Sequence, residues 1–113
     1  MPFIDLKITE TLTEDKKTAL KTKIGEKVSL LNKPESYLMV GIDAGYDLYF
    51  AGKKLQKGAF VQVSLFGRPA SADCEKMTAA ICSILKDELC IDGNSVYVAY
   101  SGTENWGWNG VNF

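Results

Sequence analysis

The sequence predicts an α+β fold in which a four-stranded mixed sheet carries two helices on one face. Two observations support this class. A strand–helix–strand order of hydrophobic patterns occurs twice, and one face of the predicted strands is far more apolar than the other. The chain has 113 residues and a mass of 12.4 kDa, and it contains no linker or low-complexity segment. Residues 1–113 are therefore expected to form a single domain.

The doubled pattern consists of four alternating segments and two helical segments. Phe3–Ile8 and Tyr37–Ile42 alternate as strands on either side of the first helical segment. Phe60–Leu65 and Ser95–Tyr100 repeat this order around the second. Each βαβ unit is expected to contain parallel strands, because a helical crossover returns the chain in the same direction.

The first predicted helix begins where Thr11–Glu14 fits a capping box, and Pro34 closes the helical region. Its apolar stripe consists of Leu20, Ile24, Val28 and Leu31. In the second helix Ser71 or Asp73 is the expected cap, and Gly93-Asn94 marks the following turn. The stripe of this helix is Met77, Ile81, Ile84, Leu85 and Leu89. Short further strands are expected at Asp47–Phe50 and near Trp106–Trp108.

The two faces of the predicted strands differ in composition. One face is apolar and suits a cover of two helices: Ile4, Leu6, Ile8, Leu38, Val40, Ile42, Val61, Val63, Leu65, Val96 and Val98. The other mixes aromatic and polar side chains: Phe3, Asp5, Lys7, Tyr37, Met39, Phe60, Gln62, Ser64, Phe66, Tyr97 and Ala99. We expect subunits of an oligomer to meet on this second face. The alternative is a monomer with a few exposed aromatics.

Composition excludes several classes of function. Lysine and arginine number 13 against 14 acidic residues, and the charges are scattered, so neither nucleic acid nor an anionic membrane is an expected partner. No apolar run approaches the roughly 20 residues that span a bilayer. The first residues, with Asp5, Lys7 and Glu10 among them, do not form a signal peptide. The chain is expected in the cytosol, and any release would follow an unconventional route.

Cys74, Cys82 and Cys90 lie in or at the end of one predicted helix. Their helical spacing separates neighbours by about 12 Å along the axis, which is too far for a disulfide. They are interpreted as core or surface thiols, and no metal or cofactor motif accompanies them.

The chain begins Met1-Pro2 and contains no histidine. A small second residue permits removal of the initiator methionine, which leaves the secondary amine of Pro2 as the new N-terminus. An α-amino group titrates near neutral pH, at about 8. Because the usual general base is missing, Pro2 is the candidate base of an enzyme. The alternative is that Met-Pro is simply a common start.

Several segments together resemble the macrophage migration inhibitory factor family of the tautomerase superfamily. These are Pro2 at the start of a strand, Lys33–Tyr37 after the first helix, Val96-Tyr97-Val98, and the terminal Gly107–Phe113. The resemblance runs from end to end and implies a homotrimer whose sheets face the centre. It implies keto–enol tautomerisation of phenylpyruvate-type 2-oxo acids and D-dopachrome analogues, with no cofactor. It also implies a possible cytokine role with a cell-surface receptor as partner.

Site roles follow from this resemblance residue by residue. Pro2 matches the family's catalytic base, Lys33 the position that binds the substrate carboxylate, and Phe66 a backbone N–H that also donates to it. Tyr97 matches an aromatic contributed by the neighbouring subunit. The remaining positions that match the apolar surroundings of the substrate are Phe3, Tyr37, Trp106, Trp108 and Phe113. Burial and the Lys33 cation are expected to lower the pKa of the Pro2 amine.

Alternatives stay open for these roles and for the activity. Lys33 could be a solvated lysine at a helix end, and the aromatic residues could serve packing alone. Ala99 stands where many members carry asparagine, while Phe66 and Trp106 replace smaller residues. These departures would suit a secreted cytokine mimic with a vestigial pocket. Decarboxylation or hydration ranks low because Arg68 is the only arginine, and a non-catalytic trimeric domain is the remaining alternative.

Overall fold

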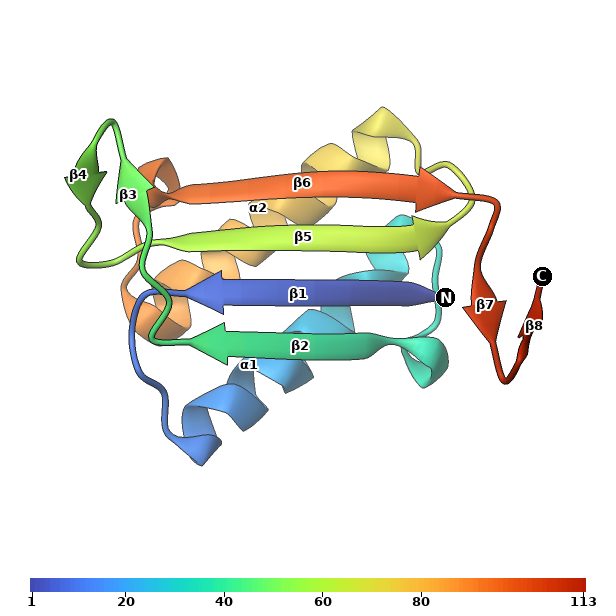
Figure 1. Cartoon of the computed structure of the whole chain (residues 1–113), viewed down its shortest axis with the longest axis horizontal. Helices are drawn as coiled ribbons and strands as arrows, with labels where there is room; N and C mark the ends of the chain where they lie inside the picture. The colour runs from blue at the N-terminus through green and yellow to red at the C-terminus, as the bar shows by residue number, and fades with distance from the viewer.

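The computed structural model describes all 113 residues and confirms the α+β class (Figure 1). Its main elements are β1 (Pro2–Ile8), α1 (Glu14–Lys27), β2 (Met39–Ala44), β5 (Ala59–Phe66), α2 (Ser71–Leu89) and β6 (Val96–Thr103). The four strands form one sheet in the order β2-β1-β5-β6. The pairs β1–β2 and β5–β6 are parallel, whereas the central pair β1–β5 is antiparallel. Two parallel βαβ units therefore join into one mixed sheet, as predicted.

Two small hairpins lie at opposite ends of this sheet (Figure 1). One consists of β3 (Tyr49–Phe50) and β4 (Lys53–Lys54), and the other consists of β7 (Gly107–Trp108) and β8 (Val111–Asn112). The short strands predicted in these two regions are thus present. Three single 3₁₀ turns complete the chain at Val28–Leu31, Glu35–Tyr37 and Gly93–Ser95.

Both helices cover the same face of the sheet (Figure 1), and the hydrophobic core fills the space between these layers. The central strands β1 and β5 bury every second residue, as their alternation predicts. The core comprises Ile4, Leu6, Ile8, Leu20, Ile24, Val28, Leu31, Ala59, Val61, Val63, Leu65, Met77, Ile81, Ile84, Leu85, Leu89 and Ile91. Apolar residues of the outer strands β2 and β6 pack against it only partly buried, because the helices cover the middle of the sheet best.

The predicted helix caps were wrong at both helices. The cap of α1 is Thr13, whose hydroxyl accepts the Lys16 N–H at 3.2 Å, so the Thr11–Glu14 capping box does not form. In α2 the cap position is Ala70, which has no side-chain bond, and Ser71 is already the first helical residue. Each cap lies within three residues of the predicted one, which is the usual uncertainty of a helix end.

The second predicted strand also begins later than expected. Tyr37 lies in a 3₁₀ turn, and β2 starts at Met39 and continues to Ala44. Pro34 holds an extended backbone before that turn, with φ −78° and ψ 148°. Tyr37 is therefore placed at the end of the sheet rather than on its face.

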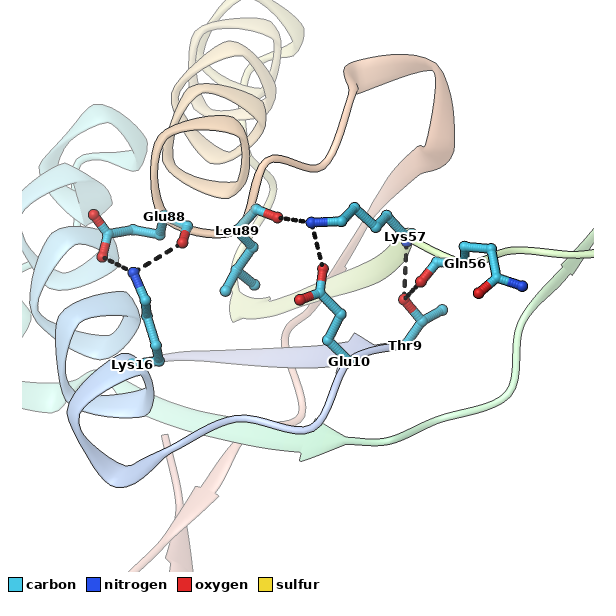
Figure 2. A network of polar contacts seen from close by, with 8 residues as sticks. Thr9, Glu10, Lys16, Gln56, Lys57, Glu88 and Leu89 are labelled. Atoms are coloured by element: carbon cyan, nitrogen blue, oxygen red, sulfur yellow. Dashed lines mark hydrogen bonds and ion pairs between the residues drawn. The ribbon is translucent and has the colours of Figure 1, made fainter.

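A polar network fixes the end of the sheet opposite the N-terminus (Figure 2). The Thr9 hydroxyl donates to the Gln56 carbonyl at 3.2 Å and accepts the Gly58 N–H at 3.0 Å. The Lys57 ammonium donates to the Leu89 carbonyl at 3.1 Å and pairs with the Glu10 carboxylate at 3.4 Å. These bonds tie the end of β1 and the end of α2 to the segment that enters β5.

All three cysteines are free thiols, as predicted; Cys74 and Cys82 lie in α2, and Cys90 directly follows it. None of the helices combines the length and the apolar character that crossing a membrane requires.

Candidate active site

Pro2 is buried at the first position of the central strand β1, and the neighbouring hairpin β7–β8 stands beside this end of the sheet (Figure 1). A cavity of about 490 Å³ opens here. Its lining residues are Met1, Pro2, Phe3, Ser36, Tyr37, Leu38, Met39, Trp106, Gly107 and Trp108. The structure thus brings five of the predicted site residues together around one cavity, which is in the size range of small-molecule pockets.

Aromatic contacts hold one wall of this cavity and the C-terminal segment that continues from it. The Tyr37 and Trp108 rings meet edge to face with centroids 6.0 Å apart. Phe66 and Phe113 make a second edge-to-face pair at 5.7 Å. The Phe113 N–H donates to the Trp106 carbonyl at 3.1 Å, which closes the C-terminal hairpin. The last eight residues therefore form one aromatic wall that is anchored to both Tyr37 and Phe66.

Lys33 lies close to the N-terminal amine. Its ammonium donates to the Phe66 carbonyl at 3.0 Å, which places the cation beside the end of β5. Burial lowers the pKa of the Met1 amine below its ordinary value, and the charge of Lys33 lowers it further. Both causes were predicted for the amine of Pro2, one residue further along the chain. An amine in these surroundings is more easily kept neutral, and a neutral amine can accept a proton.

The backbone N–H of Phe66 has a partner in this structure: it donates to the Met1 carbonyl at 3.3 Å. Pro2 lies opposite Leu65 in the antiparallel β1–β5 register, so Met1 reaches Phe66 directly. A substrate carboxylate could receive this bond only after Met1 has left. No pattern in the sequence predicts that the Met1 carbonyl and a substrate carboxylate compete for the Phe66 N–H.

Tyr97 does not lie at this site. It pairs with Phe60 at the opposite end of β5 from Phe66, and its ring contacts Phe50 at 5.6 Å. Six residues of strand separate the two ends, or roughly 20 Å. One chain therefore does not bring Tyr97 to its own Pro2, and the supply of Tyr97 by a neighbouring subunit stays a prediction.

Sequence reasoning missed several residues that line the cavity. Ser36 and Leu38 contribute to its wall from the turn that precedes β2, and Met39 contributes from the first position of β2. Met39 was assigned only to a possible interface, because its place on the open face was read from alternation alone. Its position near Pro2 follows from the β1–β2 register, in which Phe3 pairs with Met39.

This fold, with Pro2 buried at the start of the central strand and Lys33 near the N-terminus, is that of the tautomerase superfamily. The model of the macrophage migration inhibitory factor family matches residues 1–113, and the chain belongs to that family. A comparison with curated proteins finds no match.

Solved structures with the same fold superpose closely on this chain. MIF2 of Leishmania major superposes with a TM-score of 0.93 at 30% identity, covering 100% of this chain and 97% of that chain. The macrophage migration inhibitory factor-like protein of Entamoeba histolytica gives 0.86 at 22% identity, with coverages of 99% and 98%. The protein Pt0534, solved after inactivation by 2-oxo-3-pentynoate, gives 0.86 at 18% identity, with coverages of 97% and 94%.

Proposed function

We propose that this protein is a keto–enol tautomerase of aryl 2-oxo acids, with phenylpyruvate as the model substrate. The observation that carries the proposal is the position of Pro2, which is buried at the start of β1 in the lining of an aromatic cavity, with the Lys33 cation bound nearby to the Phe66 carbonyl. The cavity suits a phenyl group, and the cation suits a carboxylate. Pt0534, which shares this fold, is inactivated by 2-oxo-3-pentynoate, which is also a 2-oxo acid.

In the proposed reaction Pro2, freed of Met1, is the only group that moves a proton. The amine takes the proton from the enol hydroxyl and returns it to the adjacent carbon, which becomes CH₂ as the ketone forms. Lys33 binds the carboxylate and stabilises the negative charge that develops on the oxygen. Aromatic side chains around Pro2 exclude water and so favour the neutral amine.

Removal of Met1 has two effects in this proposal. It creates the secondary amine of Pro2, and it releases the Phe66 N–H from the Met1 carbonyl. That N–H then becomes a second donor to the substrate carboxylate. A chain that retains Met1 lacks both the base and this donor, so it is expected to be inactive.

The proposed enzyme is a homotrimer, and the open face of its sheet is the surface that meets the neighbouring subunits. Tyr97, Met39 and Phe50 are exposed on or beside this face in a single chain. A neighbour that supplied its Tyr97 to the cavity would complete the site from two chains. Sedimentation velocity across a concentration series measures this assembly directly.

The proposal is tested with untagged protein whose loss of Met1 is verified by intact mass. Phenylpyruvate tautomerisation is followed by ultraviolet absorbance for the wild type, for Pro2→Gly, and for a chain with an uncleaved N-terminal extension. We expect both altered forms to lose about 10²- to 10⁴-fold in kcat/KM, the usual contribution of a general base. Circular dichroism and sedimentation serve as controls for fold and assembly. Full activity in Pro2→Gly would contradict the mechanism.

The second candidate function is signalling with a weak or vestigial tautomerase activity. It is favoured by two bulky side chains at positions where the resemblance implies smaller residues: Trp106 in the cavity wall, and Phe66 in its edge-to-face pair with Phe113. An inactive wild type with Met1 fully removed would support this function. Receptor binding by the Pro2→Gly variant would then be the decisive measurement.

A further inference from the structure

A second cleft lies next to the candidate active site, on the other side of Lys33. It has a volume of about 350 Å³ and lies where α2 begins. The lining residues that matter here are Asn32, Lys33, Leu65, Phe66, Arg68 and Asp73. Lys33 and Phe66 belong to both the cleft and the surroundings of the amine, and Leu65 is the strand partner of Pro2. A ligand held at Lys33 can therefore extend into this cleft.

The cleft carries two cations without carboxylate partners. Lys33 makes one hydrogen bond, to the Phe66 carbonyl, which leaves two of its three N–H donors free. Arg68 is exposed and makes no ion pair or side-chain hydrogen bond, whereas eight ion pairs engage acidic groups elsewhere in the chain. Asp73 is the one acid in the lining, and the Asn32 amide donates to its carboxylate at 3.1 Å. The net charge of the cleft is positive.

The loop that carries Arg68 is held in place by its neighbours. Gly67 has a φ of +91°, which a residue with a Cβ rarely adopts, and its N–H donates to the Thr103 carbonyl at 2.8 Å. A Cβ at Gly102 would collide with the Gly67 carbonyl oxygen, so β6 approaches this loop as closely as backbone allows. Pro69 restricts the backbone directly after Arg68. Because this loop is already held in place, binding an anion here would order only the Arg68 side chain.

We infer that this cleft binds a second carboxylate, and that the substrates include 2-oxo dicarboxylic acids as well as aryl 2-oxo acids. The inference rests on the proposed function and extends its substrate class. Lys33 binds the carboxylate next to the oxo group in both classes. The substituent on the enolising carbon then decides in which direction the substrate extends from Lys33. A phenyl group enters the aromatic cavity, whereas a carboxylate enters the cleft and binds Arg68. The planar guanidinium suits a carboxylate because it can donate two parallel bonds.

The reaction on a dicarboxylate is the same isomerisation. The enol O–H bond breaks and a C–H bond forms on the adjacent carbon, while the C=C double bond becomes single and the C–O bond becomes C=O. Pro2 carries the proton between the two atoms. No oxidant, reductant or further reactant takes part, and the second carboxylate leaves unchanged.

The inference is tested first by binding, using fumarate and cinnamate. Both are planar trans acids that lack the reactive hydroxyl, and they differ only in carrying a carboxylate or a phenyl group at the far carbon. Calorimetry gives Kd for the wild type, Arg68→Ala, Arg68→Lys and Lys53→Ala. Lys53 is an exposed lysine without an ion pair in the distant β3–β4 hairpin, so its removal controls for net charge.

We expect Arg68→Ala to weaken fumarate about tenfold, the low end for a hydrogen bond to a charged group. Cinnamate should change less than about twofold, since a phenyl group does not enter the cleft. The fumarate Kd of Arg68→Lys should lie between those of the wild type and Arg68→Ala. Lys53→Ala should change the Kd of neither ligand. An unchanged fumarate Kd in Arg68→Ala, or an equal loss for both ligands, would overturn the inference. So would a wild type that does not bind fumarate.

Kinetics then separate this inference from the proposed function. Tautomerisation of oxaloacetate and phenylpyruvate is compared in the wild type and in Arg68→Ala, and we expect a selective rise of KM for oxaloacetate. Turnover of phenylpyruvate without an Arg68 effect on either fumarate or oxaloacetate leaves the tautomerase in place and removes the second carboxylate site. Selective fumarate binding without turnover of either acid would keep the second carboxylate site and contradict the proposed tautomerase.

Discussion

The two faces of the four-stranded sheet are built from the same strands, but one is buried and the other is largely exposed in a single chain. On the helix side Ile4, Leu6 and Val63 are completely buried in a core without polar side chains. On the open side Met39 remains 68% exposed and Tyr97 64% exposed in a single chain. Because successive side chains of a strand point to opposite faces, neighbouring residues belong to different sets. One face stabilises the protomer, and the other is available for assembly and for the candidate site.

This difference separates stability from function within the same strand. Phe3 and Leu6 both belong to β1, yet Phe3 lines the candidate cavity and Leu6 is buried in the core. Substitutions on the helix side should therefore change unfolding in a way that does not depend on protein concentration. Substitutions on the open side should change assembly and turnover, and their effects should depend on concentration.

The largest effect is expected from Leu6→Ala. Leu6 is fully buried between the sheet and the helices, and the truncation leaves a cavity that the neighbouring core residues fill only partly. We expect a loss of about 2–5 kcal/mol in the free energy of unfolding, measured by denaturant titration. The loss should be the same at low and high protein concentration. A loss that disappears at high concentration would show that this face, too, is stabilised by assembly.

A mixing experiment tests the open face. Tyr97→Ala should fold with an unchanged circular dichroism spectrum, while phenylpyruvate turnover falls about tenfold because an aromatic contact to the substrate is lost. Subunits of Tyr97→Ala mixed with inactive Pro2→Gly subunits should regain activity on reassembly. Mixed oligomers then contain sites with an intact Pro2 from one chain and an intact Tyr97 from the other.

The mixing experiment has a clear contrary result. If both residues acted within one chain, mixing would restore nothing, because no subunit in the mixture carries both. The roughly 20 Å between the two ends of β5 argues against that arrangement. An unmixed sample of each variant, treated in the same way, controls for activity gained by refolding alone.

The sequence predicted those parts of the fold that depend on local periodicity. Alternation located β1, β5 and β6 and assigned Leu6 and Tyr97 to opposite faces, because the side-chain period of a strand is two. Helix caps were less predictable, since Thr11 and Thr13 offer the same hydroxyl and only the chain path selects Thr13.

The candidate site was predictable only in part. The resemblance placed Pro2 and Lys33, and the structure brings both to one end of the sheet. The bond between Met1 and the Phe66 N–H depends on strand register, and the shared cleft of Lys33 and Arg68 depends on two loops that are distant in sequence. Neither arrangement leaves a periodic signal in the chain.

Lys33→Gln tests how the charge of Lys33 affects the pKa of the N-terminal amine. Glutamine can still donate to the Phe66 carbonyl, but it removes the charge that helps to lower the pKa of the N-terminal amine. The pKa of the amine should rise, although burial, the larger cause, still holds it below its ordinary value. Because the neutral amine is the base, the acid limb of the kcat/KM profile should move to higher pH. KM should rise about tenfold through loss of the carboxylate anchor. An unmoved acid limb would show that Lys33 does not act on the amine.

The smallest effect is expected at the solvent edge of the covered face, where Glu88 of α2 links the two helices. Its carboxylate pairs with Lys23 at 2.9 Å and with Lys16 at 3.8 Å, both on α1. The hydrogen bond from Lys23 lowers the pKa of this carboxyl below its ordinary value of 4.5. A lowered pKa in the folded state means that the stabilisation is present above the ordinary value and is lost as pH falls through the folded one.

Glu88→Gln should therefore lower Tm slightly at neutral pH and leave it unchanged in strong acid, where the wild-type carboxyl is protonated as well. Glu14→Gln is the matched control, since Glu14 is 90% exposed and pairs with Lys17 within one helix at 3.4 Å. That substitution should change Tm less, because the exposed Glu14–Lys17 pair lies within one helix and links it to no other element. Equal shifts in both variants would mean that the two helices are held together by their apolar contacts alone. The Glu88 link would then contribute nothing measurable to the covered face.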